Sequence, residues 1–174
     1  MFNGNEVAKN IIFAKYRLEN KCNCMEKDKF TVIIVEDVKL ELKGTEEIFR
    51  NEIPNAKVIG TAMNETEFWP LIAKQEPDLL LLDLGLGGST TIGVDICRQV
   101  RERYPRVKVL IFTGEILNEM LWVDVLDAGA QGIILKTGEL LTANDVRSVM
   151  NGKQLVFNEP ILEKIVARFK ESVL

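Results

Sequence analysis

The stretch that decides the fold is LLLLDLGLGGSTTIG, residues 79–93. Four consecutive leucines followed at once by Asp83 predict a short strand that is buried on both faces. Strands of this kind belong to parallel sheets, which helices cover on both sides. The glycines after Asp83 leave two interpretations open. They either cradle a phosphate through their backbone N–H groups, or they form an open rim around an aspartate that carries the chemistry itself.

Comparable runs recur along the chain. Short apolar runs predict strands at residues 30–35, 56–62, 78–83, 107–112 and 132–135, and helical spacing predicts helices at 38–51, 64–75, 92–104, 116–128 and 139–150. The alternation of five strands with five helices predicts an α/β fold, with a five-stranded parallel sheet that is doubly wound by helices on both faces.

The start of the helix expected at 64–75 can be read in two ways. Asn64 and Glu67 have the spacing of a capping box, which would begin the helix there. Pro70 interrupts the pattern, so the helix could instead begin near Trp69 with the proline in its first turn. Both starts remain open at this point.

Composition excludes several classes of function. The net charge is −4 over 174 residues, which gives no support for a nucleic-acid surface. No apolar run approaches the roughly 18 residues of a membrane span, so we expect no membrane contact and a cytoplasmic location. The chain has no histidine, which excludes Ser-His and Cys-His nucleophiles. Cys22 and Cys24 alone are too few ligands for a structural zinc site.

Polar residues follow four of the five predicted strands. They are Glu36 and Asp37, then Asp83, then Thr113 with Gly114, and last Lys136. Since the carboxyl ends of parallel strands meet at one edge of a sheet, where ligands bind, we expect these residues to lie together. Each one alone could simply cap a helix or be a solvated charge. Because such residues follow four of the five predicted strands, we favour a functional site over a set of unrelated helix caps and solvated charges.

The three acids of this set would repel one another unless a cation joins them, and hard oxygen ligands suit Mg²⁺. A partly neutralised Asp83 could then act as a nucleophile toward a phosphoryl group. The ammonium of Lys136, the hydroxyl of Thr113 and the backbone N–H of Gly114 would stabilise the phosphoryl oxygens.

Four motifs in this order, VIIVED (32–37), LLLLDL (79–84), LIFTGE (110–115) and GAQGIILK (129–136), resemble the receiver domain of two-component response regulators. The last motif, and Thr137 after it, look most like the LuxR-type (NarL-like) branch. The resemblance covers roughly residues 30–152 and implies a flavodoxin-like (CheY-like) fold. It also implies a signalling domain that catalyses only its own phosphorylation and dephosphorylation.

The resemblance assigns roles residue by residue. Asp83 would be the phosphoacceptor. Glu36, Asp37, Asp83 and the backbone carbonyl of Gly85 would bind Mg²⁺. Thr113 and Ile133 would occupy the switch positions, and Lys136 the position of the family's lysine.

The resemblance also implies partners and a domain plan. A sensor histidine kinase would donate the phosphoryl group, and activation would favour a homodimer. We expect an N-terminal extension at 1–28, partly disordered, and a receiver domain at 29–152. Residues 153–174 resemble a linker helix toward a DNA-binding output domain that this chain does not contain, so a C-terminal helical extension is expected. DNA would be bound only through that domain.

Two departures from the family pattern support a competing hypothesis. Ile133 stands where an aromatic switch residue is usual, and the loop after Asp83 is longer, with Gly87 in place of a proline. The alternative function is therefore a pseudo-receiver, a protein–protein interaction module that works without phosphorylation. Dinucleotide-binding enzymes and haloacid-dehalogenase-type phosphatases fit less well. The first strand is followed by EDVKLELKG rather than a glycine fingerprint, and Gly85 stands where such phosphatases have a second acid.

Overall fold

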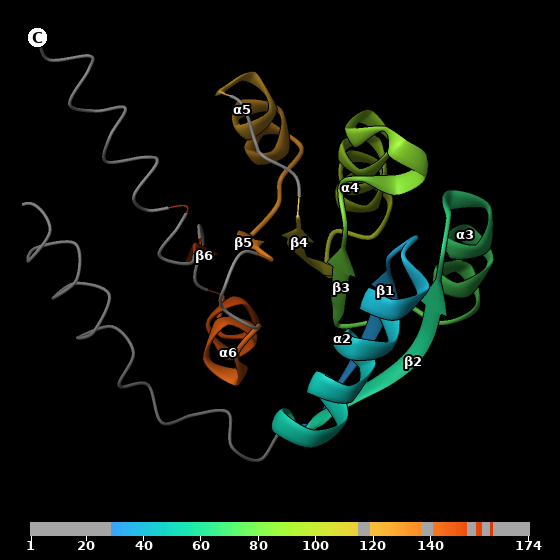
Figure 1. Cartoon of the computed structure of the whole chain (residues 1–174), viewed down its shortest axis with the longest axis vertical. Coiled ribbons are helices and arrows are strands. Elements are labelled where there is room, and N and C mark those ends of the chain that lie inside the picture. The colour runs from blue at the N-terminus through green and yellow to red at the C-terminus, as the bar shows by residue number, and fades with distance from the viewer. Residues whose placement is uncertain (1–28, 115–118, 137–140, 153–155, 158–160, 162–174) are drawn as a thin grey trace, which may run out of the picture.

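The computed structural model describes residues 29–114, 119–136, 141–152, 156–157 and 161 (Figure 1). Its strands are β1 (Phe30–Val35), β2 (Ala56–Ala62), β3 (Leu79–Leu82), β4 (Lys108–Thr113), β5 (Gly132–Leu135) and β6 (Val156–Phe157). Its helices are α2 (Lys39–Glu52), α3 (Glu65–Lys74), the 3₁₀ turn η1 (Leu86–Gly88), α4 (Thr90–Arg103), α5 (Glu119–Asp127) and α6 (Ala143–Met150).

The strands form one parallel sheet in the order β2-β1-β3-β4-β5-β6. The order reverses between β1 and β3, and this is the position at which open α/β sheets bind their ligands. The five predicted strands are confirmed within one residue at either end. Helices lie on both faces of the sheet, so the predicted doubly wound α/β fold is confirmed (Figure 1).

The prediction of five strands is wrong by one. Val156 and Phe157 pair with Gly132 and Ile133, so β6 extends the sheet inside the segment that was expected to be a linker helix. An added Cβ at Gly132 would lie 2.7 Å from the carbonyl oxygen of Val156, so the glycine permits this close approach. A strand of two residues has no periodicity that a sequence pattern could reveal.

Two apolar layers hold the sheet. On one face α3, α4 and α5 cover a core that includes Leu80 and Leu82, and on the other face α2 and α6 cover Leu79 and Leu81. All four leucines are at most 2% exposed, because successive side chains of a strand point to opposite faces. The run of leucines is therefore explained by a strand buried on both sides.

The helix α3 begins after Asn64, which caps it, and the alternative start near Trp69 is wrong. The side chain of Asn64 accepts a hydrogen bond from the backbone N–H of Glu67 at 3.0 Å, and the Glu67 carboxylate accepts one from the N–H of Met63 at 2.8 Å. The first bond satisfies an N–H group that the first turn would leave free, and the second is made to Met63, one residue before the N-cap whose N–H a capping box would use. Pro70 consequently lies inside the helix.

The expected N-terminal extension lies outside the described residues, as does most of the expected C-terminal helix. Ile161, which belongs to that helix in the prediction, is buried in the core beneath α3, α4 and α5. Within the described ranges, no helix has the length and apolar character needed to span a membrane.

Candidate functional site

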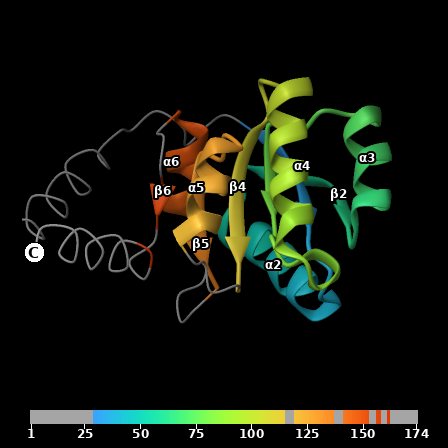
Figure 2. The same ribbon diagram turned by 90° about the horizontal axis from the view of Figure 1, so that it is seen from above.

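Three predicted acids meet at the carboxyl edge of the sheet. Glu36 and Asp37 follow β1 directly, and Asp83 follows the neighbouring strand β3. The N–H of Asp83 continues the ladder to the carbonyl oxygen of Val35 at 2.9 Å, which places the two strand ends side by side. One carboxylate oxygen from each acid lies within 4.8 Å of the others. In Figure 2 the arrow of β4 points to this same end of the molecule, where α2 begins.

The glycine-rich loop after Asp83 holds one of these acids in place. Leu86 is 1% exposed and anchors the turn η1, while Gly87 and Gly88 have φ values of 61° and 76°. Such positive φ values strongly favour glycine. The backbone N–H of Gly87 donates a hydrogen bond of 2.8 Å to the Asp37 carboxylate. The carbonyl oxygen of Gly85 accepts a bond of 3.2 Å from the N–H of Gly88 and keeps a second lone pair.

Lys136 lies among the acids directly after β5. Its ammonium group donates hydrogen bonds to Glu36 and, at 2.7 Å, to Glu41 in the first turn of α2. The nearest oxygen of Asp83, Oδ1, lies 3.7 Å from the same nitrogen. This oxygen is buried and has no hydrogen-bond partner among the described residues. A buried carboxylate oxygen without a partner is costly, which suits a position kept for a ligand.

Burial and charge shift two pKa values at the site. Burial raises the pKa of Glu36, and the charge of Asp83 adds to the increase, although the hydrogen bond from Lys136 opposes it. Burial alone would lower the pKa of Lys136, but the hydrogen bonds to Glu36 and Glu41 and the charge of Asp83 together raise it. The ammonium of Lys136 is therefore firmly charged at neutral pH.

The remaining predicted residues lie at different depths. Thr113 ends β4 fully buried, and its carbonyl oxygen accepts a bond of 2.8 Å from the N–H of Lys136. Gly114 is exposed, and an added Cβ there would meet nothing within 4 Å, so the approach is open. Ile133 is fully buried on β5 in the core beneath α3, α4 and α5. The structure thus brings Glu36, Asp37, Asp83 and Lys136 together, with Thr113 on the strand between β3 and β5.

Sequence reasoning missed two residues. Glu41 contacts Lys136, and its only sequence signal is an acid in the first turn of a helix, which is common there. Gly93 lies in the first turn of α4, where an added Cβ would be 2.6 Å from Leu84 Cα and 2.9 Å from the Asp83 carbonyl oxygen. Gly93 therefore lets α4 pack directly against the segment that carries Asp83.

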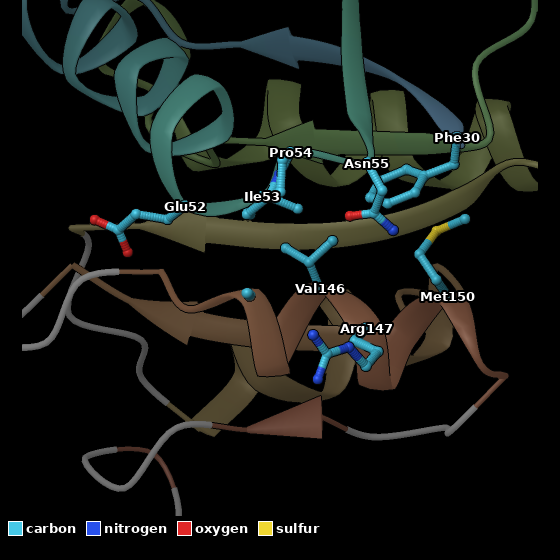
Figure 3. Close-up of a pocket in the computed structure, with 9 residues that line it drawn as sticks. Phe30, Glu52, Ile53, Pro54, Asn55, Val146, Arg147 and Met150 are labelled. Carbon is cyan, nitrogen blue, oxygen red and sulfur yellow. The ribbon is translucent and has the colours of Figure 1, made fainter. Parts of the chain in front are cut away.

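A separate hollow of about 200 Å³ lies far from these acids, at the amino end of β1 (Figure 3). It opens between α6 and the segment that joins α2 to β2. Apolar and polar groups share its lining, which consists of Phe30, Glu52, Ile53, Pro54, Asn55, Ala143, Val146, Arg147 and Met150. None of the predicted site residues lines it, so it is not the candidate site.

Comparison with known proteins supports the fold and the family. The model of the response regulator receiver domain matches residues 32–145, which is more than half of the chain. The transcriptional regulatory protein DegU of Brevibacillus brevis is 30% identical over 112 residues, covering 64% of this chain and 46% of that protein. The DNA-binding transcriptional activator DevR/DosR of Mycobacterium tuberculosis is 27% identical over 128 residues, covering 73% and 57%. The chain thus spans about half the length of these curated relatives.

Solved structures share the same fold. The isolated receiver domain of RcsB from Salmonella enterica serovar Typhimurium, with a phosphomimetic beryllofluoride, has a TM-score of 0.68 at 22% identity. The match covers 78% of this chain and 98% of that one. A LuxR-family response regulator from Aurantimonas has a TM-score of 0.69 at 21% identity, covering 82% and 99%.

The chain belongs to the response regulator receiver domain family, as the sequence motifs predicted. Its relatives are response regulators of the LuxR (NarL-like) family of two-component systems. Domains of this family are signalling domains rather than enzymes in the usual sense.

Proposed function

We propose that this receiver accepts a phosphoryl group on Asp83 from a sensor histidine kinase, in a Mg²⁺-dependent reaction, and changes conformation as a result. The observation that carries the proposal is the Asp83 carboxylate. One of its oxygens is buried without a hydrogen-bond partner among the described residues, 3.7 Å from the ammonium of Lys136. A nucleophile needs such an available oxygen, and the transferred group needs the nearby cation.

The acids fit Mg²⁺. Glu36, Asp37 and Asp83 offer hard oxygen ligands within 4.8 Å of one another, and the open lone pair of the Gly85 carbonyl offers a fourth. When bound, the metal would offset the negative charge of the acids and withdraw electrons from the phosphoryl oxygens. The hydrogen bond from Gly87 already orients one of the ligands, Asp37.

The chemical step follows from these positions. A carboxylate oxygen of Asp83 forms a bond to phosphorus while the P–N bond to the kinase histidine breaks. The imidazole leaves with the electron pair of that bond and takes up a proton from solvent. Lys136, together with Thr113 and the N–H of Gly114, would hold the oxygens of the transferred group. The open approach at Gly114 leaves room for the donor.

The proposal also includes the response to phosphorylation, which is dimerisation and control of transcription. The relatives include a DNA-binding transcriptional activator, DevR/DosR, and a solved structure of RcsB dimers bound to DNA. By analogy with them, we propose that phosphorylation favours a homodimer and controls transcription through an output domain of the same type, in the cytoplasm. Residues 29–152 would be the receiver unit of that arrangement, with 1–28 as an extension and 153–174 as the linker.

The test is incubation of the full chain with acetyl phosphate and Mg²⁺, followed by intact-mass measurement. We expect a mass increase of one phosphoryl group that requires Mg²⁺, is lost in Asp83→Asn, and remains in the control Asp124→Asn. Asp124 is an exposed aspartate on α5 and does not belong to the group of acids that could hold a metal ion. The absence of any adduct in the wild type would contradict the proposal and favour the phosphorylation-independent interaction module.

A further inference from the structure

Glu41 is the one ion-pair partner of Lys136, among the described residues, that the proposed phosphoryl chemistry does not use. It lies at the third position of α2, and its carboxylate accepts a hydrogen bond of 2.7 Å from the Lys136 ammonium. The side chain of Glu41 is 47% exposed, whereas that of Lys136 is only 12% exposed. A half-exposed acid therefore reaches over the site and pairs with a largely buried cation.

This pairing determines where the ammonium of Lys136 points. The group has three N–H donors, and Glu36 and Glu41 together draw it toward β1 and α2. Asp83 Oδ1 lies 1.0 Å farther away than the Glu41 oxygen, at 3.7 Å against 2.7 Å, and receives no hydrogen bond from it. The oxygens of a phosphoryl group on Asp83 would compete with Glu41 for the same donors.

The negative charge of Glu41 also opposes an incoming phosphoryl group. Glu36, Asp37, Asp83 and Glu41 contribute four negative charges, and Lys136 contributes one positive charge. Glu41 is the member of this set that lies outside the cluster able to hold a metal ion. A bound divalent cation would therefore not neutralise it directly, and its charge would remain to oppose an incoming phosphoryl group.

We propose that Glu41 is a positioning residue that holds Lys136 away from Asp83 and restrains phosphorylation until the phosphoryl oxygens displace it. The inference rests on the proposed function of Asp83. It assigns to Glu41 no contact with the phosphoryl group and no role in binding the metal. Its effect passes through the ammonium of Lys136.

A structural explanation of the same contact predicts a different outcome. An acid in the first turn stabilises a helix through its macrodipole, and this effect does not depend on Lys136. If that were the whole role of Glu41, its neutralisation would lower stability slightly and leave the chemistry of Asp83 unchanged. The two explanations are separable because one of them requires coupling between Glu41 and Lys136.

The experiment uses the full chain and compares Glu41→Gln with Glu46→Gln. Glu46 is also on α2 and lies outside the ion pairs of Lys136, so its change removes the same charge without the contact. The measurements are the rate of phosphorylation by acetyl phosphate with Mg²⁺ and the affinity for beryllofluoride by calorimetry. Since half-exposed ion pairs are weak, we expect Glu41→Gln to increase both by about two- to fivefold and Glu46→Gln to leave both near the wild-type values.

A third variant tests the route of the effect. In a Lys136→Gln background, beryllofluoride binding will be weaker overall, and adding Glu41→Gln should then bring no gain. A gain that persists without Lys136, or that equals the gain from Glu46→Gln, would mean a general charge effect and would overturn the proposal. No gain in Glu41→Gln alone would overturn it too. A wild type that takes no phosphoryl group would instead reject the proposed function and, with it, this role of Glu41.

Discussion

Gly93 allows a sharp prediction because the chain contains a matched control. Gly93 and Gly44 are both inside helices, α4 and α2, so replacement by alanine brings the same gain in helix propensity, about 0.5–1 kcal/mol. They differ in what the new methyl group meets. At Gly44 it meets nothing within 4 Å, whereas at Gly93 it would lie 2.6 Å from Leu84 Cα. Leu84 Cα is a backbone atom and cannot move aside as the end of a flexible side chain would.

The difference between the two variants follows from this contact. Forcing an extra methyl group into a packed site costs about 1–3 kcal/mol, and the propensity gain cancels in the comparison. For a chain of this length, each kcal/mol shifts Tm by about 2–4 °C. Gly93→Ala should therefore unfold about 2–12 °C below Gly44→Ala, while Gly44→Ala should unfold at or above the wild-type temperature.

Thermal unfolding followed by circular dichroism, with urea unfolding as a second measure, provides the assay. Equal stability of the two variants would refute the reasoning, because it would mean that α4 does not pack closely against the Asp83–Leu84 segment. Such a result would also remove the role given to Gly93, which is to let α4 pack against the segment that carries Asp83.

Two further predictions concern the acids. The pKa of Glu36 is raised, first by burial and then by the charge of Asp83, so the folded state binds this proton more tightly than the unfolded state does. Its contribution to stability is therefore present below the ordinary pKa of 4.5 and is lost as the pH rises through the higher folded value. Urea unfolding of Glu36→Gln between pH 4 and 8 should lack this decline, and a parallel decline in both proteins would contradict the assignment. Mg²⁺ at about 100 times its Kd should stabilise the wild type and the control Asp124→Asn by about 2.7 kcal/mol. The same addition should give much less in Asp37→Asn, and an undiminished gain there would argue against Asp37 as a ligand.

Much of the site could be predicted from the sequence because it depends on the ends of strands. Apolar runs such as residues 79–82 are recognisable by themselves, and parallel strands bring their carboxyl ends to one edge whatever the details of packing. Glu36, Asp37, Asp83 and Lys136 were predicted on this ground, and the structure brings them together. Their roles in phosphoryl transfer and metal binding remain predictions.

Other features could not be predicted, because they depend on pairs of residues far apart in the chain. The ion pair between Glu41 and Lys136 joins residues 95 positions apart, and the hydrogen bond from Gly87 to Asp37 joins residues 50 apart. The sixth strand exists because the sheet edge at β5 offers Val156 and Phe157 a partner, not because two residues prefer extended backbone.

The sequence by itself determined the class of fold, the order of its elements and the set of polar residues at their ends, since periodicity and strand polarity are local properties. Only the tertiary structure decided which of those residues touch, which oxygen of Asp83 has no hydrogen-bond partner in the described part of the chain, and that Glu41 shares Lys136 with Glu36. The physical reason is that hydrogen bonds and ion pairs depend on separations of a few tenths of an ångström. Such separations depend on how residues pack in three dimensions, as in the close approach of Gly93 to Leu84 and the burial of Leu86, and the sequence alone does not give them.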